Sequence, residues 1–194
     1  DISSAGSINY HSLNSAGNAT LTATNSITQT NSSQAQNISY TTQADIDIQG
    51  TQLATNNITH QAQNINLQQH TTNDIIYATD IQITADNSLN NHSHIYTTAQ
   101  TDINTTTLNN HNQINTQGTL NIKSTALNNT LNATIAANNH LAIDSQDTIT
   151  NGGTMGSLET IKITSDDLAN SGQITATDIH IANSNNTSNS GKIN

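Results

Sequence analysis

The stretch LANSGQITATDIHIAN, residues 168–183, contains the pattern that decides the fold. Apolar residues recur at short intervals, at Leu168, Ile174, Ile179 and Ile181, and polar or small residues fill the gaps. Ile179 and Ile181 flank a single residue, and this alternation is the period of a β-strand, whose successive side chains point to opposite faces. No apolar stripe with the period of a helix is sustained anywhere in the chain, so the pattern predicts an all-β protein.

The same apolar pair recurs along the chain at intervals of about 20 residues, which is the mark of a repeat architecture. Each unit contains two further apolar positions, so three short strands fit within one unit. Three strands in such a unit predict one coil of a parallel β-solenoid, with coils stacked about 4.8 Å apart. Eight or nine coils are expected. The pairs lie at 46–48, 65–67, 81–83, 120–122, 141–143, 161–163 and 179–181, with weaker copies at 19–21 and 103–105.

The composition agrees with a stacked aliphatic core. The chain has 194 residues, of which 2% are aromatic, all of them Tyr, and it has no Pro, Cys, Phe or Trp. Aliphatic side chains suit a narrow core, Asn tolerates tight turns, and stacked Asn side chains can form amide ladders. Pro is absent because internal coils need their backbone N–H groups for the ladder. The lack of charge runs and of Pro argues against disorder.

Charge excludes two classes of partner. The net charge is −10, with only three basic residues, Lys123, Lys162 and Lys192. Binding of nucleic acid or of an anionic membrane surface depends on clustered Lys and Arg, so neither partner is expected. No stretch is apolar enough for a transmembrane segment. The opening DISSAGSINY lacks a signal-peptide pattern and the closing TSNSGKIN looks like the start of another unit, so we expect a piece of a longer protein.

Two places depart from the repeat. The interval between Leu21 and Ile48 is the widest, which predicts a bulged coil or loop there. The segment NGGTMGSLE, residues 151–159, has three Gly residues and the only Glu of the chain. Gly-rich segments favour turns, so we expect a protruding turn at 151–159.

The line at 168–183 resembles the filamentous-haemagglutinin repeat, a Leu-x-Asn-x-Gly-x-Ile phrase followed by an apolar pair and Asn. LNNHNQINTQGTLNIKSTALNN (108–129) and LNATIAANNHLAIDSQDTITNGG (131–153) are looser copies. The resemblance is good over 108–194 and weaker over 1–107, where the Asn-x-Gly phrase is mostly missing. We therefore expect one β-helix segment over 1–194, with irregular coils over 1–107 and regular repeats over 108–194.

This resemblance implies a right-handed parallel β-helix that serves as the shaft of an exoprotein secreted by a two-partner system. It also implies export through an outer-membrane barrel transporter and display at the bacterial surface, in adhesion or contact-dependent growth inhibition. The receptor, the target cell and any attached toxin are left open. Nothing in the chain resembles the secretion domain or the toxin of such proteins.

Two sets of side chains are candidates for a functional site, and each also has a plainer structural interpretation. His92 and His94, with His111, form the best metal-like group, because alternate strand residues face one side. No Cys or Glu lies near them, so loop histidines are the favoured interpretation and no metal site is predicted. The acid pairs Asp144 with Asp147 and Asp166 with Asp167 are interpreted as solvated turn residues, although β-helix enzymes that cleave acidic polysaccharides use clustered acids.

Three functions follow, in order of preference. The first is a structural shaft, without catalytic, cofactor-binding or metal-binding residues. The second is a direct binding module, suggested by the irregular first half and by four Tyr residues expected to be exposed, Tyr10, Tyr40, Tyr77 and Tyr96, since Tyr is enriched at interfaces. The third is a polysaccharide-cleaving enzyme, which would need at least three acids converging in one groove.

Overall fold

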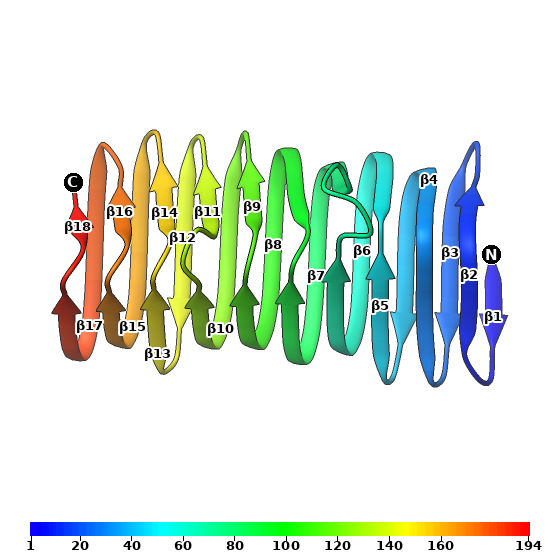
Figure 1. Ribbon diagram of the computed structural model, residues 1–194, viewed down its shortest axis with the longest axis horizontal. Coiled ribbons are helices and arrows are strands. Elements are labelled where there is room, and N and C mark those ends of the chain that lie inside the picture. Colours follow the sequence, from blue (N-terminus) through cyan, green and yellow to red (C-terminus); the bar gives the residue numbers. More distant parts are fainter.

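The computed structural model describes all residues from Asp1 to Asn194. The chain is an all-β, right-handed parallel β-solenoid of about 10 turns with about 19 residues in each coil, which confirms the predicted fold and exceeds the expected eight or nine coils. Figure 1 shows the coils side by side along one axis, with the two chain ends at opposite ends of the rod. No helix of the length and apolarity needed to cross a membrane occurs.

All strands belong to one parallel sheet wound around the rod. The strands are β1 (Ile2–Ser4), β2 (Ile8–Asn14), β3 (Asn18–Ala23), β4 (Ser26–Thr42), β5 (Asp45–Gln49), β6 (Thr51–Gln68), β7 (Ile75–Asn91), β8 (His94–Asn110), β9 (Gln113–Thr116), β10 (Thr119–Asn129), β11 (Thr134–Ala137), β12 (His140–Ser145), β13 (Thr148–Asn151), β14 (Thr154–Ser157), β15 (Thr160–Asn170), β16 (Gln173–Thr175), β17 (Asp178–Asn189) and β18 (Lys192–Ile193).

The rod has three faces, defined by one coil. Face A contains β12 and the segments stacked in register with it, face B contains β13, and face C contains β14. The long strands β6, β7 and β8 pass over all three faces, whereas later coils are divided into shorter strands. On every face, alternate side chains point inward, as the strand period requires.

The core consists of inward columns in which each residue stacks on its equivalent in the next coil. On face A, Ile103 pairs with Ile122, which pairs in turn with Ile143. Thirty-eight buried residues form one hydrophobic cluster along the rod. Stacking therefore buries the apolar side that a single coil cannot bury alone.

Between Leu21 and Ile48, where a bulged coil or loop is expected, no loop forms, but the pairing of β4 with β2 shifts register between Gln29 and Ser32. Leu21 stacks on Tyr40 of face A, and Ile48 belongs to face B, where it stacks on Gln29. The wide interval arises because the apolar pair at 19–21 lies on face A, whereas the pair at 46–48 lies on face B. The chain between them is the continuous strand β4.

The largest excursion from the stack lies instead at residues 69–74, between β6 and β7, and it is visible in Figure 1. The Asp74 carboxylate organises this loop: it accepts hydrogen bonds from the backbone N–H groups of His70 (2.7 Å) and Thr71 (2.5 Å) and from the Thr51 hydroxyl (3.0 Å). Burial by itself would raise the pKa of Asp74, but these hydrogen bonds outweigh it and hold the pKa below its usual value.

The Gly-rich segment 151–159 does not protrude as predicted. Strand β14 pairs with β11 on one side and with β16 on the other, and Met155 is fully buried in the core. Gly153 allows a close approach at the corner between faces B and C, because a Cβ there would overlap the carbonyl oxygen of Ala133. Only Leu158 and Glu159, at the next corner, are exposed.

Irregularities of register are concentrated in the first half of the rod. They occur in the pairings of β2 with β4, β4 with β6, β6 with β7, and β7 with β8. After residue 107 the only shift lies between Ser165 and Asp167. The division of the segment at residue 107 remains a prediction.

Candidate functional site

A ladder of buried asparagines runs through the second half of the rod, at the last inward position of face B. Each side-chain amide donates to the amide oxygen of the next coil at 2.7–2.8 Å. A second donated bond reaches a backbone carbonyl of face C, for example from Asn110 to Thr134 (3.0 Å). The ladder predicted from composition is thus confirmed, and it satisfies polar groups inside the core. Its buried members are Asn91, Asn110, Asn129, Asn151 and Asn170, and the exposed Asn189 is the last acceptor.

In the first half of the rod, a different polar cluster occupies the interior. Gln29 and Ser33 are fully buried, and the Gln29 Oε1 atom accepts from the hydroxyls of Tyr10 (2.8 Å) and Ser33 (2.9 Å) and from Gln52 Nε2 (3.0 Å). The Tyr40 hydroxyl contacts both Tyr10 and Ser33. The cluster occupies positions that are aliphatic in later coils: Ser33 stacks on Gln52, which stacks on Ile76 in the same inward column.

His60 completes this cluster and is fully buried. Its Nε2 lies 2.8 Å from Gln52 Oε1, its ring packs on Tyr40 at 5.0 Å between centroids, and its Nδ1 has no partner. Burial lowers the pKa of His60 from 6.5 to about 4, and burial raises the pKa of both Tyr10 and Tyr40. The cluster is therefore neutral at pH 7.

The prediction that all four Tyr residues are exposed is wrong for Tyr40, which is 0% exposed, and for Tyr10, which is half-buried against the core. Tyr40 occupies the inward column of Leu21, where its hydroxyl finds partners in the buried cluster. Tyr77 and Tyr96 do point outward, on face C, and their rings stack with centroids 5.8 Å apart. Leu53 lies in register beside Tyr77, so this is the one outward row of large apolar side chains on the faces of the rod.

The three histidines that could form a metal-binding group do not converge: His92 contacts His111, whereas His94 contacts Tyr96. The rings of His92 and His111 stack at 4.3 Å, whereas His94 lies edge-on to Tyr96 at 6.2 Å. Burial and the neighbouring His111 lower the pKa of His92, and burial lowers the pKa of His94. No cluster of three or more His, Asp or Glu side chains suited to a metal ion forms in the chain.

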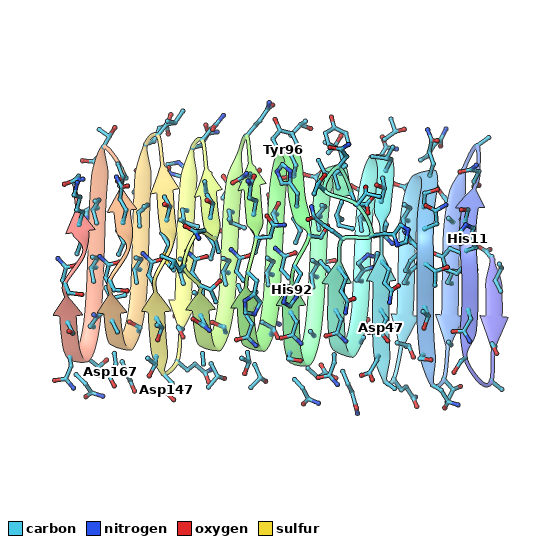
Figure 2. All side chains as sticks on the ribbon, in the orientation of Figure 1. His11, Asp47, His92, Tyr96, Asp147 and Asp167 are labelled. Carbon is cyan, nitrogen blue, oxygen red and sulfur yellow. The ribbon has the colours of Figure 1, made fainter.

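Of the acid pairs, only Asp144 and Asp147 are separated, whereas the backbone N–H groups of Asp166 and Asp167 both donate to the Asp147 carbonyl oxygen, at 3.0 and 3.1 Å. Asp144 points outward from face A beside Lys123 of the preceding coil, while Asp147 lies beyond the corner. The Asp167 carboxylate accepts from the backbone and side chain of Asn186, at 3.0 and 3.1 Å. Figure 2 shows Asp147 and Asp167 along one edge of the rod, far from Tyr96. The only contact between a basic and an acidic side chain within 4.0 Å is exposed and long, 3.9 Å between His140 Nε2 and Glu159 Oε2.

Two hollows on the surface form what we call the corner groove, at the corner between faces A and B. One hollow of about 720 Å³ spans the coils of Ser4, Thr22, Thr41 and Gln61, and reaches Asp86. The other, of about 320 Å³, continues from Asp86. With coils about 4.8 Å apart, the corner groove is roughly 34 Å long. The lining of the second hollow includes Thr84, Asn104, Thr106, Lys123, Thr125 and Asp144.

Sequence reasoning missed the corner groove, because its lining residues are unremarkable one by one. They are mostly Thr, Ser, Gln and Asn, the residues that dominate the whole chain. Only the register of the coils shows that they share one corner. No protein-family model matches the chain, and comparisons with curated proteins and with solved structures find no significant match.

Proposed function

We propose that this chain is a shaft segment of a bacterial surface exoprotein of the filamentous-haemagglutinin type, which displays a receptor-binding or toxin region. The observation that supports it is the continuous stack of coils, with an aliphatic core and an internal Asn ladder. The chain makes 146 backbone–backbone hydrogen bonds, and those between coils run along the rod. Such bonding makes a rod resistant to bending and stretching.

The proposal includes the route and place of display. An outer-membrane barrel transporter would export the unfolded chain, and folding into coils would follow outside the cell. These elements rest on the resemblance of residues 108–194 to the haemagglutinin repeat. The role assigned to the segment is mechanical and requires no catalytic residue.

Deletion of one whole coil from the parent exoprotein tests the shaft role. Thr119 stacks on His140, so removal of residues 119–139 joins two coils in register. We expect display and target-cell attachment to persist, with a reach shorter by about 4.8 Å. Deletion of residues 119–129 alone breaks the register and serves as the contrast. Loss of attachment on deletion of the whole coil, with display intact, would contradict a purely mechanical role.

A second candidate function is direct binding by this segment. It is favoured by the outward Tyr77–Tyr96 stack, which Leu53 extends on face C. Purified residues 1–194 would then bind to target cells without the rest of the exoprotein, and Tyr96→Ser would reduce that binding. Absence of binding to the cells that the parent recognises leaves the shaft role alone.

A further inference from the structure

Several polar side chains of the corner groove are free of hydrogen bonds to the rest of the protein. On part of the outer side of face B, the side chains form a ladder: Asn66 donates to the Asp47 carboxylate at 2.8 Å, and Asn90 donates to the Asn66 amide oxygen at 2.9 Å. In the corner groove, the side chains of Asn104, Lys123 and Asp144 make no hydrogen bond within the protein, whereas the Thr106 hydroxyl donates to the Asp86 carbonyl oxygen at 2.6 Å. The groove therefore presents free donors and acceptors to a ligand.

One polar atom beneath the groove is buried and unpaired. Ser124 lines the second hollow and is 6% exposed, yet its hydroxyl has no hydrogen-bond partner. The inward hydroxyls of the next two coils, by contrast, do find partners: Ser145 donates to the Thr125 carbonyl (2.8 Å) and Ser165 to the Asn183 side chain (3.0 Å). A buried polar group without a partner is uncommon and calls for an explanation.

The chemistry of the lining selects the class of ligand. The second hollow has a single hydrophobic lining residue, so an apolar ligand would gain little there. Hydroxyls and carboxamides both donate and accept, which matches the hydroxyls of a sugar. The charges present are Asp86, Lys123 and Asp144, a net negative set on a protein of net charge −10, so an acidic polymer is disfavoured.

The shape of the groove selects an extended polymer. Equivalent side chains recur in each coil from Ser4 to Gln146, about 4.8 Å apart. The residues of an extended glycan repeat at a similar spacing, so successive sugars can meet successive coils. We propose that the corner groove binds a neutral polysaccharide chain laid along the axis of the rod. This site is independent of the shaft role, since it requires only the folded segment.

Titration of residues 1–194 with cellohexaose, xylohexaose and mannohexaose, followed by amide NMR, tests the proposal. We expect at least one hexasaccharide to shift the signals of groove residues in several successive coils. The corresponding disaccharide should bind about tenfold more weakly or less, because it spans fewer coils and forms fewer contacts.

Two matched variants locate the binding. Asn104 in the groove and Asn128 on face B both point outward, and neither side chain makes a hydrogen bond. Asn104→Tyr fills the second hollow and should weaken hexasaccharide binding about tenfold or more, whereas Asn128→Tyr should bind as the wild type does. Circular dichroism checks that both variants fold. The proposal is overturned if none of the three hexasaccharides binds, or if Asn104→Tyr binds as well as the wild type.

Discussion

At the scale of single residues, the interior of the rod contains polar groups that a solenoid core would not be expected to include. His60 stands between Tyr40 and Ile83 in the inward column of face A. Its neutral form is imposed by burial, because a charged imidazolium without a counter-ion is costly in a dry core. Stability of the first half of the rod should therefore depend on pH.

Acid destabilises the folded chain through His60. The pKa is near 6.5 in the unfolded chain and about 4 in the folded one. The unfolded state binds the proton first, so the free energy of unfolding falls as pH drops from 6.5 to about 4, by about 3 kcal/mol from this residue. Urea unfolding at pH 7.5 and 4 measures the loss. His60→Leu should lose less stability over this range, and the exposed control His180→Ala should lose as much as the wild type.

The Asn ladder gives a second prediction at this scale. Asn129→Asp removes two donated hydrogen bonds, to Asn151 (2.8 Å) and to the Thr154 carbonyl (3.1 Å), and places an acid in the core. We expect a loss of about 3 kcal/mol or more at pH 7, measured by urea unfolding, since an unpaired buried charge is strongly destabilising. The neighbouring outward variant Asn128→Asp should change stability by less than about 0.5 kcal/mol. Equal effects of the two variants would argue against a buried ladder.

At the scale of elements, coil corners set the distance between strands. Gly153 and Gly172 occupy equivalent corner positions of successive coils, and a Cβ at Gly172 would overlap the carbonyl oxygen of Gly153. The backbone N–H of Gln173 donates to the same carbonyl at 2.8 Å. The corner therefore has no room for a side chain without loss of a bond between coils.

Gly172→Ala should accordingly destabilise the rod by about 1–3 kcal/mol, the usual cost of overpacking. Gly156 provides the control, because it points outward and a Cβ there would have only ordinary contacts, at 3.9 Å from the Thr175 carbonyl oxygen. Thermal unfolding followed by circular dichroism compares the two. If Gly156→Ala lowers the midpoint as far as Gly172→Ala does, close approach at the corner is not the reason for the glycine.

The coils could be predicted from the sequence because the positions of the apolar residues show both the alternation of a strand and the repeat of about 20 residues. Ile161 and Ile163 illustrate this, since their alternation alone places both side chains inward. The register of the first half could not be predicted, because Tyr40 and His60 occupy positions of the inward column of face A where an aliphatic residue is expected. The apolar repeat is therefore interrupted there. The corner groove could not be predicted either, since it depends on which Thr and Asn side chains share a corner.

At the scale of the whole molecule, the rod is a series of coils that contact only their neighbours. Local damage should then open the rod locally. Ile122→Asp places a charge in the core, where the side chain is 1% exposed. We expect hydrogen exchange to accelerate first in β8, β10 and β12, which stack in register around it. The outward variant Thr150→Asp is the control, and uniform acceleration along the rod would contradict this behaviour.

The stacking of every coil on its immediate neighbour also has a kinetic consequence. Leu120 meets Leu141 of the next coil, and no strand pairing joins more distant parts of the chain. The loop that must close to form each contact between coils is therefore one coil long, whatever the number of coils in the rod. Folding rates of single domains fall as contacts become more distant in sequence. A rod built this way can lengthen by duplication without slowing the addition of any single coil.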